Sequence, residues 1–156
     1  MILILWASPN AGGLTNSAAD QVAKGIAEAG ESTSLVHLNS CRLDRCKVCG
    51  NGWGLCRAEG RCVITDDFQD LYDQVEACRG VVIVTPVYWH DLAEPLKAFL
   101  DRLRRCETAH NHRLRRKPCL LVACAGGTGR GAVQCLRNLE EALVHRDHVH
   151  VIQRLF

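Results

Sequence analysis

Four cysteines lie close together in the segment CKVCGNGWGLCRAEGRC, at Cys46, Cys49, Cys56 and Cys62. Such a group suits four kinds of chemistry: an iron–sulfur cluster, a zinc site, a disulfide knot, or free thiols that pack or form a reversible dithiol. Iron–sulfur clusters take four thiolates and tolerate varied spacing, so the segment fits a [4Fe-4S] cluster with its C-x2-C pair as the anchor. Zinc sites usually pair two short C-x2-4-C knuckles, and the Cys56–Cys62 spacing is wider. Cys41 is a spare ligand nearby.

The composition narrows these alternatives. The chain has 156 residues, 47% hydrophobic and 23% charged, with a net charge of +2. These values predict a single globular domain over residues 1–156. The segment at about 39–65 shows no convincing periodicity and is expected to be a cysteine-rich loop. The net charge is too small for nucleic acid as the main partner. The apolar run at residues 2–6 is too short for a signal peptide, and no other run approaches a membrane span. We therefore expect a cytoplasmic protein with reduced thiols, which disfavours the disulfide knot.

A second candidate site follows the first apolar run, in the stretch ASPNAGGLTNSAAD. This small, polar turn opens directly into a predicted helix, whose N-terminal backbone N–H groups and dipole suit an anion. It has neither the glycine spacing of a dinucleotide loop nor the Lys-Ser/Thr of a Walker loop. Neutral donors of this kind, with no lysine, suit the phosphate of flavin mononucleotide (FMN), although an ordinary turn and helix cap remains the alternative. The predicted binding residues of this loop are Ser8, Asn10, Leu14, Thr15 and Asn16.

Two further loops have residues suited to a planar ring. The stretch TPVYWHDLAEP offers an aromatic, partly polar slot, and AGGTGRG offers small residues whose backbone N–H groups can approach a ring edge. Each signal is weak alone, but all three loops are expected at the same edge of one sheet. The predicted cofactor-binding residues of these two loops are Thr85, Pro86, Val87, Tyr88, Trp89, Ala125, Gly126, Gly127, Thr128 and Gly129.

Strand-like and helix-like patterns alternate along the chain, which predicts an α/β fold with a doubly wound, five-stranded parallel sheet. Such sheets bind ligands beyond the carboxyl ends of their strands, at a topological switch point. Asp66 and Asp67 are expected to cap the second helix, and the helix that would follow the fifth strand is missing from the pattern. The predicted strands are 2–5, 34–38, 81–84, 119–123 and about 149 to the end, and the predicted helices lie near 18–27, 68–75, 95–103 and 133–143.

The chain resembles the flavodoxin-like NAD(P)H-dependent FMN reductases, and within them the iron–sulfur flavoproteins. The resemblance depends on ASPNAGGLTNSAAD, on CKVCGNGWGLCRAEGRCVITDDF, and on VIVTPVYW followed by LKAFLDRLRRCE, and covers nearly the whole chain. It implies the strand order 2-1-3-4-5. It also implies that the first loop holds the FMN phosphate, that residues 86–89 line the isoalloxazine, and that residues 126–129 meet its pyrimidine end. The cysteine spacing departs from the tighter C-x2-C-x2-C-x5-C run of the iron–sulfur members, because six residues separate Cys49 and Cys56.

The resulting expectation is an FMN-dependent oxidoreductase that passes electrons between a reduced donor, NAD(P)H or a small redox protein, and an acceptor, with a [4Fe-4S] cluster as second centre. One alternative is a cluster-free NAD(P)H-dependent FMN or quinone reductase. Another is a zinc- or thiol-based sensor on a flavodoxin-like scaffold that binds no flavin. No residue is predicted to be an acid–base catalyst. We expect a homo-oligomer, dimer or tetramer, that covers the open face of the sheet and brings the cysteine loop to the flavin of a neighbouring subunit.

Overall fold

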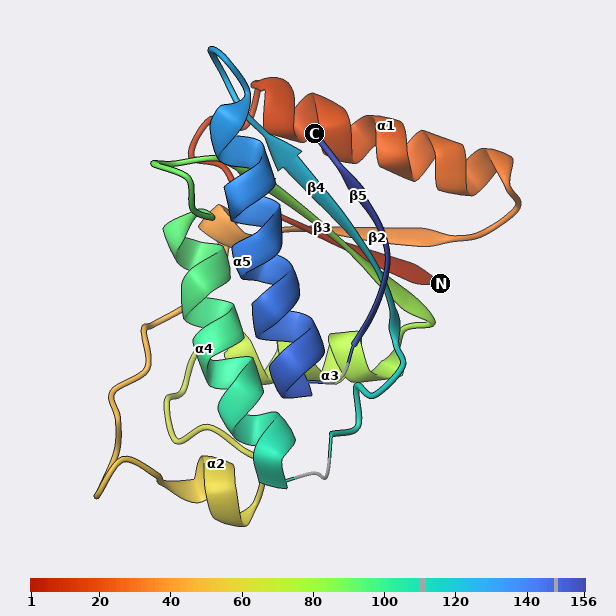
Figure 1. Cartoon of the computed structure of the whole chain (residues 1–156). Helices are drawn as coiled ribbons and strands as arrows, with labels where there is room; N and C mark the ends of the chain where they lie inside the picture. The colour runs from red at the N-terminus through yellow and green to blue at the C-terminus, as the bar shows by residue number, and fades with distance from the viewer. Residues whose placement is uncertain (110–111, 148) are drawn as a thin grey trace.

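The fold is a five-stranded parallel sheet (Figure 1), seen in a computed structural model that describes residues 1–109, 112–147 and 149–156, with only the backbone described at 145–147. The strand order is β2-β1-β3-β4-β5, with every neighbouring pair parallel, so the predicted fold is confirmed. Each strand lies within one or two residues of its prediction. The strands are β1 (Ile2–Trp6), β2 (Thr33–His37), β3 (Gly80–Pro86), β4 (Pro118–Cys124) and β5 (His150–Leu155).

Helices cover the two faces of the sheet unequally. Successive residues of β1 alternate between the faces: Leu3 and Leu5 join the larger core, and Ile4 and Trp6 join the smaller one. The larger core packs under α3 (Phe68–Ala77), α4 (Glu94–Ala109) and α5 (Arg130–Asp147), and the smaller one under α1 (Leu14–Glu28) alone. The helix predicted near 68–75 is confirmed as α3, and its buried residues, Phe68, Leu71, Tyr72 and Val75, recur at helical spacing. Two short helices, η1 (Leu38–Ser40) and α2 (Leu55–Ala58), belong to the segment between β2 and α3.

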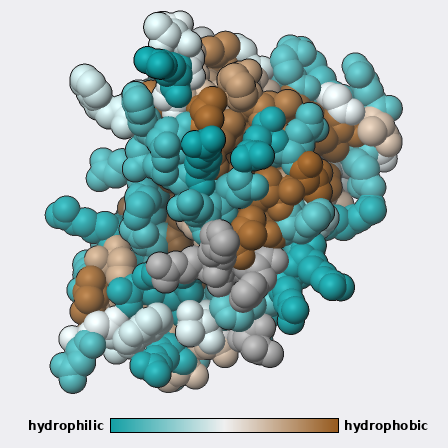
Figure 2. All heavy atoms as spheres, in the orientation of Figure 1, coloured by the Kyte–Doolittle hydropathy of each residue, from teal (hydrophilic) through white to brown (hydrophobic). Residues whose placement is uncertain are grey.

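The face under α1 is the less covered one. The final helix of the chain, α5, is present and precedes β5, which is the last element. Ile152 is the extra residue of a β-bulge in β5 and is 60% exposed, while Leu155 and Phe156 are also exposed. Figure 2 shows a strip of hydrophobic side chains between α1 and the β5 edge of the sheet. No helix among the described residues combines the length and the hydrophobicity needed to cross a membrane.

Candidate functional site

The three predicted loops lie together at the carboxyl edge of the sheet. They follow β1, β3 and β4, which are neighbours in the strand order, and the point between β1 and β3 is where that order reverses. Backbone hydrogen bonds continue the sheet into the loops: Ala7 N–H donates to the Val84 carbonyl at 3.0 Å, and Val87 N–H donates to the Cys124 carbonyl at 3.0 Å. The base of the loop cluster is therefore part of the rigid sheet.

The loop after β1, residues 7–13, is organised by the side chain of Asn10. Its Oδ1 accepts the Gly12 N–H at 3.1 Å, and its own N–H donates to Ser8 Oγ at 3.2 Å. A Cβ added at Gly13 would lie 2.9 Å from Asn10 Nδ2, so only glycine fits there without moving Asn10. Gly13 is the N-cap of α1 and has no side chain to cap it, and no acidic residue stands in the first turn. The N–H groups of residues 14–16 consequently remain available to an anion.

The other predicted residues of this loop differ in their surroundings. Thr15 is buried and bonds the thiol of Cys124, which lowers the pKa of that thiol, although desolvation by burial has the larger effect and raises it overall. Asn16 donates its amide to Asp20 Oδ2 at 3.2 Å, one turn along the helix. Leu14 is exposed. The donors that face the helix N-terminus are thus mainly backbone N–H groups.

The loop after β3 carries the predicted aromatic residues on a strained turn. Tyr88 and Asp91 exchange two backbone hydrogen bonds, and the two residues between them have positive φ, 50° at Trp89 and 69° at His90. Two consecutive positive φ values define a type I′ turn, which normally selects Asn-Gly, so this Trp-His pair stores backbone strain. Trp89 is 98% exposed and Tyr88 is half exposed. Strain that presents an aromatic ring to solvent is typical of a binding rim.

Thr85 lies inside this loop and not on its surface. Its side chain is fully buried, its Oγ1 donates to the Pro86 carbonyl at 3.0 Å, and it accepts the Ala93 N–H at 3.1 Å. Thr85 thereby joins the two ends of the loop, while Val87 is half-buried against the core. Of the residues predicted from this loop, Tyr88 and Trp89 are the ones that the structure leaves exposed.

The loop after β4 presents bare backbone. Gly127 and Gly129 have φ values of 61° and 70°, which side chains rarely tolerate, and Cβ atoms added at these positions or at Gly126 would meet nothing within 4 Å in the described part of the chain. A Cβ at Gly131 would instead lie 2.9 Å from Val87 Cγ1. The loop after β3 is therefore in close contact with the first turn of the helix Arg130–Asp147, α5. In the loop after β4, Ala125 packs against the core and Thr128 is exposed.

One residue of this edge, His37, was not predicted. Its ring stacks on Trp6 with centroids 3.8 Å apart, its Nε2 lies 2.8 Å from the Ser8 carbonyl, and its Nδ1 lies 2.8 Å from Ser40 Oγ. Because a carbonyl oxygen only accepts hydrogen bonds, Nε2 carries the proton, and in the neutral ring Ser40 donates to Nδ1. His37 thus connects the loop after β1 to the start of the cysteine segment. A lone histidine at a strand end has no sequence signal that distinguishes it.

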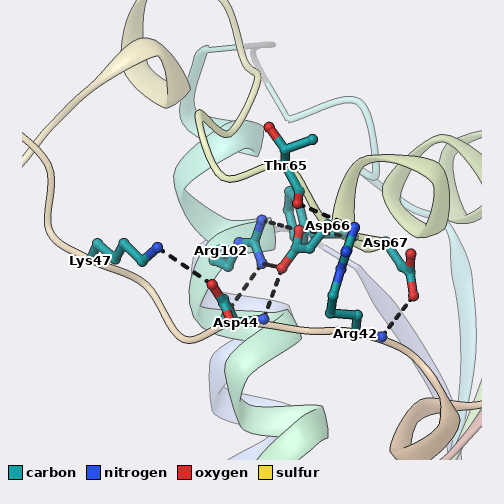
Figure 3. Close-up of polar contacts among 8 residues, drawn as sticks. Arg42, Asp44, Lys47, Thr65, Asp66, Asp67 and Arg102 are labelled. Atoms are coloured by element: carbon teal, nitrogen blue, oxygen red, sulfur yellow. Dashed lines mark hydrogen bonds and ion pairs between the residues drawn. The ribbon is translucent and has the colours of Figure 1, made fainter.

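An ion pair anchors the cysteine segment to α4 (Figure 3). Arg102 binds Asp66 through two hydrogen bonds, from Nη1 to Oδ2 at 2.6 Å and from Nη2 to Oδ1 at 2.8 Å, and the two side chains are 1% and 2% exposed. Asp66 Oδ2 also accepts the Asp44 N–H at 2.8 Å. Burial would raise the pKa of Asp66, but its hydrogen bonds with Arg102 and Asp44 outweigh burial and lower it. The beginning and the end of the segment therefore meet on one carboxylate.

The predicted helix caps are only partly as expected. Asp66 accepts the Phe68 N–H at 3.3 Å, as a capping side chain would. Asp67 occupies the N-cap position of α3 without a side-chain capping bond, because its Oδ2 accepts the Arg42 N–H at 2.7 Å instead. The Asp67 carboxylate, which was predicted to cap the helix, therefore binds the backbone of the preceding loop instead.

The four predicted cysteines line one pocket. Cys46, Cys49, Cys56 and Cys62 line a small pocket with a cavity volume of about 20 Å³, together with Arg102, Arg105 and Cys106 of α4. We name this set the cysteine pocket. Within the described ranges, no three His, Cys, Asp or Glu side chains are already placed to hold a metal ion. The donor set fits an iron–sulfur cluster in number and chemistry, and its ligation requires the sulfur atoms to move closer together.

Two further cysteines lie near this segment. Cys106 belongs to the buried core, and it also lines the cysteine pocket. Desolvation, followed by the proximity of Cys62 and Cys56, raises the pKa of Cys106 to about 12, so this thiol is neutral at physiological pH. Cys41, expected to be a spare ligand, lines a separate groove with Tyr88 and residues of α4 and is not among the residues that line the cysteine pocket.

The cysteine pocket is far from the loop cluster along α4. Figure 1 shows α2 beside the C-terminal half of α4, at the opposite end from the carboxyl edge of the sheet. With a rise of about 1.5 Å per residue, Cys106 lies about 18 Å along the helix from Glu94. The ring centroid of Trp53, in the same segment, lies 4.8 Å from the guanidinium carbon of Arg105 and 5.7 Å from that of Arg57. One helix therefore connects the two candidate sites.

Comparisons with known proteins agree with this geometry. The sequence model of the NADPH-dependent FMN reductases matches residues 1–155. The chain is 30% identical over 136 residues to an iron-sulfur flavoprotein of Methanosarcina thermophila, covering 85% of this chain and 63% of that relative, and 31% identical over 96 residues to one of Archaeoglobus fulgidus, covering 62% and 42%. The chain thus spans less than two thirds of the length of these relatives. The fold is shared with an NAD(P)H:quinone oxidoreductase from Methanothermobacter marburgensis, at TM-score 0.69 and 16% identity, over 97% of this chain and 81% of that one.

Proposed function

Because the chain belongs to the NADPH-dependent FMN reductase family, we propose that it is an FMN-dependent oxidoreductase whose flavin lies at the edge formed by the loops after β1, β3 and β4. The observation that carries the proposal is the loop after β1, which leaves three backbone N–H groups of α1 without a side-chain cap beside a glycine that Asn10 requires. Bound FMN would supply two-electron exchange with a nicotinamide and one-electron exchange with other centres. The donor is NAD(P)H or a small redox protein.

In this site the protein binds and orients the flavin. The N–H groups of residues 14–16, with Ser8 and Asn10, would hold the phosphate, and the partial positive charge of the helix N-terminus would balance its charge. Tyr88 and Trp89 would line the isoalloxazine, and the bare backbone of residues 126–129 would meet the polar edge of the ring. No side chain is assigned a proton-transfer role.

The cysteine pocket is the proposed site of a [4Fe-4S] cluster, held by Cys46, Cys49, Cys56 and Cys62. Its distance from the flavin edge along α4 favours electron transfer to the flavin of a neighbouring subunit over transfer to the flavin of its own. The exposed hydrophobic strip beside α1 supports a homo-oligomer, because a parallel sheet is normally covered on both faces. A second candidate, the cluster-free FMN or quinone reductase, is favoured by the open arrangement of the four thiols.

Charge reversal in the first turn of α1 tests the flavin site. Asn16→Glu places an anion beside the proposed phosphate and should abolish FMN binding, whereas Gln21→Glu makes the same charge change on an exposed position further along α1 and should not. FMN binding is followed by quenching of flavin fluorescence, and folding by circular dichroism. Equal FMN affinity in the two folded variants would remove the proposed site.

Iron and acid-labile sulfide assays on anaerobically purified protein separate the two candidates. Flavin absorption with a broad brown band, lost in Cys49→Ser while FMN stays bound, is expected for the cluster protein. Flavin without iron or sulfide would leave the simple reductase, and a colourless protein would leave the thiol or zinc sensor. Sedimentation velocity at micromolar concentration tests the oligomer, and a stable monomer would contradict it.

A further inference from the structure

Arg102 is the charged side chain most completely enclosed by the cysteine pocket and its anchor. It is 1% exposed, lines the pocket with Cys62 and Cys106, and its guanidinium carbon lies 4.2 Å from the ring centroid of Phe68. A buried guanidinium held by an aromatic face and a bidentate carboxylate has one orientation. Its position relative to the sulfur atoms is therefore set by the fold.

The hydrogen bonds of Arg102 to oxygen atoms use three of its five N–H groups. Nη1 donates to Asp66 and to the Asp44 carbonyl at 2.9 Å, and Nη2 donates to Asp66. Nε is buried and has no hydrogen-bond partner among the described residues. Burial alone would lower the pKa of Arg102, but hydrogen bonding to Asp66 and to Cys62 raises it. A buried donor without an acceptor costs about 1–3 kcal/mol, so an arginine held there for anchoring alone would be a poor solution.

We propose that Arg102 is a positioning residue for the cluster site: with a cluster bound, its Nε–H would donate to a sulfur in the cysteine pocket, and its charge would raise the reduction potential of the cluster. This inference rests on the proposed [4Fe-4S] cluster. Reduction adds one electron to a site already ligated by four thiolates, with no bond or proton exchanged. A fixed cation and a hydrogen bond to sulfur stabilise that added charge, and both are known determinants of cluster potentials.

The anchoring role of Arg102 can be separated from its role toward sulfur, because Asp66 shares only the first. Arg102→Gln removes the charge and the Nε–H, and Asp66→Asn weakens the same ion pair but keeps the guanidinium. Both variants and the wild-type chain are reconstituted anaerobically with iron and sulfide. Iron and sulfide content is measured first, and the midpoint potential is then followed by electron paramagnetic resonance.

We expect the midpoint potential of Arg102→Gln to fall, so that the reduced-to-oxidised ratio at a fixed potential drops at least tenfold, which corresponds to 59 mV for a one-electron couple. Asp66→Asn removes a nearby anion, so its potential should stay equal or rise. If Arg102→Gln holds no cluster while Asp66→Asn keeps its cluster, the role of Arg102 toward sulfur is supported. If both variants lose the cluster equally, the proposal is overturned, because the loss of the Arg102–Asp66 anchor alone would explain the result.

The two proposals fail in different ways. Wild-type protein without iron and sulfide overturns the cluster and this inference with it. Wild-type protein and Arg102→Gln that both hold clusters of the same potential overturn the inference alone and leave the proposed function intact.

Discussion

The replacement Gly13→Ala tests how the loop after β1 is built. The new Cβ would lie 2.9 Å from Asn10 Nδ2 and 3.1 Å from its Cγ, both shorter than a normal van der Waals contact, while the backbone of Gly13 has an ordinary φ of −94°. The strain therefore comes from the clash and not from the backbone. Asn10 must rotate away, and its hydrogen bond from Gly12 N–H is lost.

The expected magnitude follows from these contacts. One lost hydrogen bond of the loop costs about 1 kcal/mol, and alanine is a poorer N-cap than glycine by roughly 0.5–1 kcal/mol. The free energy of unfolding should fall by about 1–2 kcal/mol. Because the loop must return to its original conformation when FMN binds, the binding free energy of FMN should weaken by about 1 kcal/mol, which raises the FMN Kd about fivefold.

Gly25→Ala is the matched control in the same helix. Gly25 is exposed in the interior of α1, and an added Cβ would meet nothing within 4 Å in the described structure, so alanine should stabilise the protein by about 1 kcal/mol. Urea unfolding gives the stability of both variants, and fluorescence titration gives their FMN affinity. Unchanged FMN affinity in Gly13→Ala, or equal weakening in Gly25→Ala, would refute the assigned role of this loop.

Two other features of the structure lead to direct measurements. Asp66→Asn leaves a buried guanidinium unpaired and should lower the free energy of unfolding by about 3–5 kcal/mol at pH 7. Because folding lowers the pKa of Asp66, this difference from wild type should persist as the pH falls to the ordinary pKa of about 3.9, and should vanish only as the pH falls through the lowered pKa. Urea titrations in which the difference already shrinks near pH 6 would contradict the assignment. The double replacement Trp89→Asn, His90→Gly suits the type I′ turn and should raise the free energy of unfolding by about 1–2 kcal/mol, measured by thermal and urea unfolding. The same variant should bind FMN more weakly. A variant that is less stable and binds FMN equally well would show that the turn is neither strained nor part of the site.

The periodicity of apolar residues in the sequence was sufficient to predict the strands of the sheet. The β3 sequence VVIV is buried on both faces, and such continuous apolar runs, alternating with amphipathic helices, allow few topologies. The three loops at the carboxyl edge were predictable for the same reason, because parallel strands bring the ends that follow β1, β3 and β4 to one edge. The roles of single side chains were less predictable. Thr85 has a side chain of the type expected at the rim of a binding site, but its hydroxyl accepts the Ala93 N–H in the interior of the loop.

The cysteine segment was predictable in chemistry but not in placement. Its residues show no periodicity from which a position on the scaffold could be derived, and its anchor joins residues distant in the chain, Asp44, Asp66 and Arg102. The sequence does not distinguish Arg102 from the other arginines of α4, since nothing in it marks the helix face that is buried. Cys106 is part of the core, and nothing in the sequence shows that it also lines the cysteine pocket.

Helix α4 explains why both sites occur on one small sheet. Its N-terminal turns follow the loop that carries Tyr88 and Trp89, and its C-terminal turns supply Arg102, Arg105 and Cys106 to the cysteine pocket. A rigid helix keeps these two regions at a fixed separation. In the proposed oligomer, a two-fold arrangement of two chains would bring the flavin edge of one chain toward the cysteine pocket of the other, and each chain would contribute half of two electron paths.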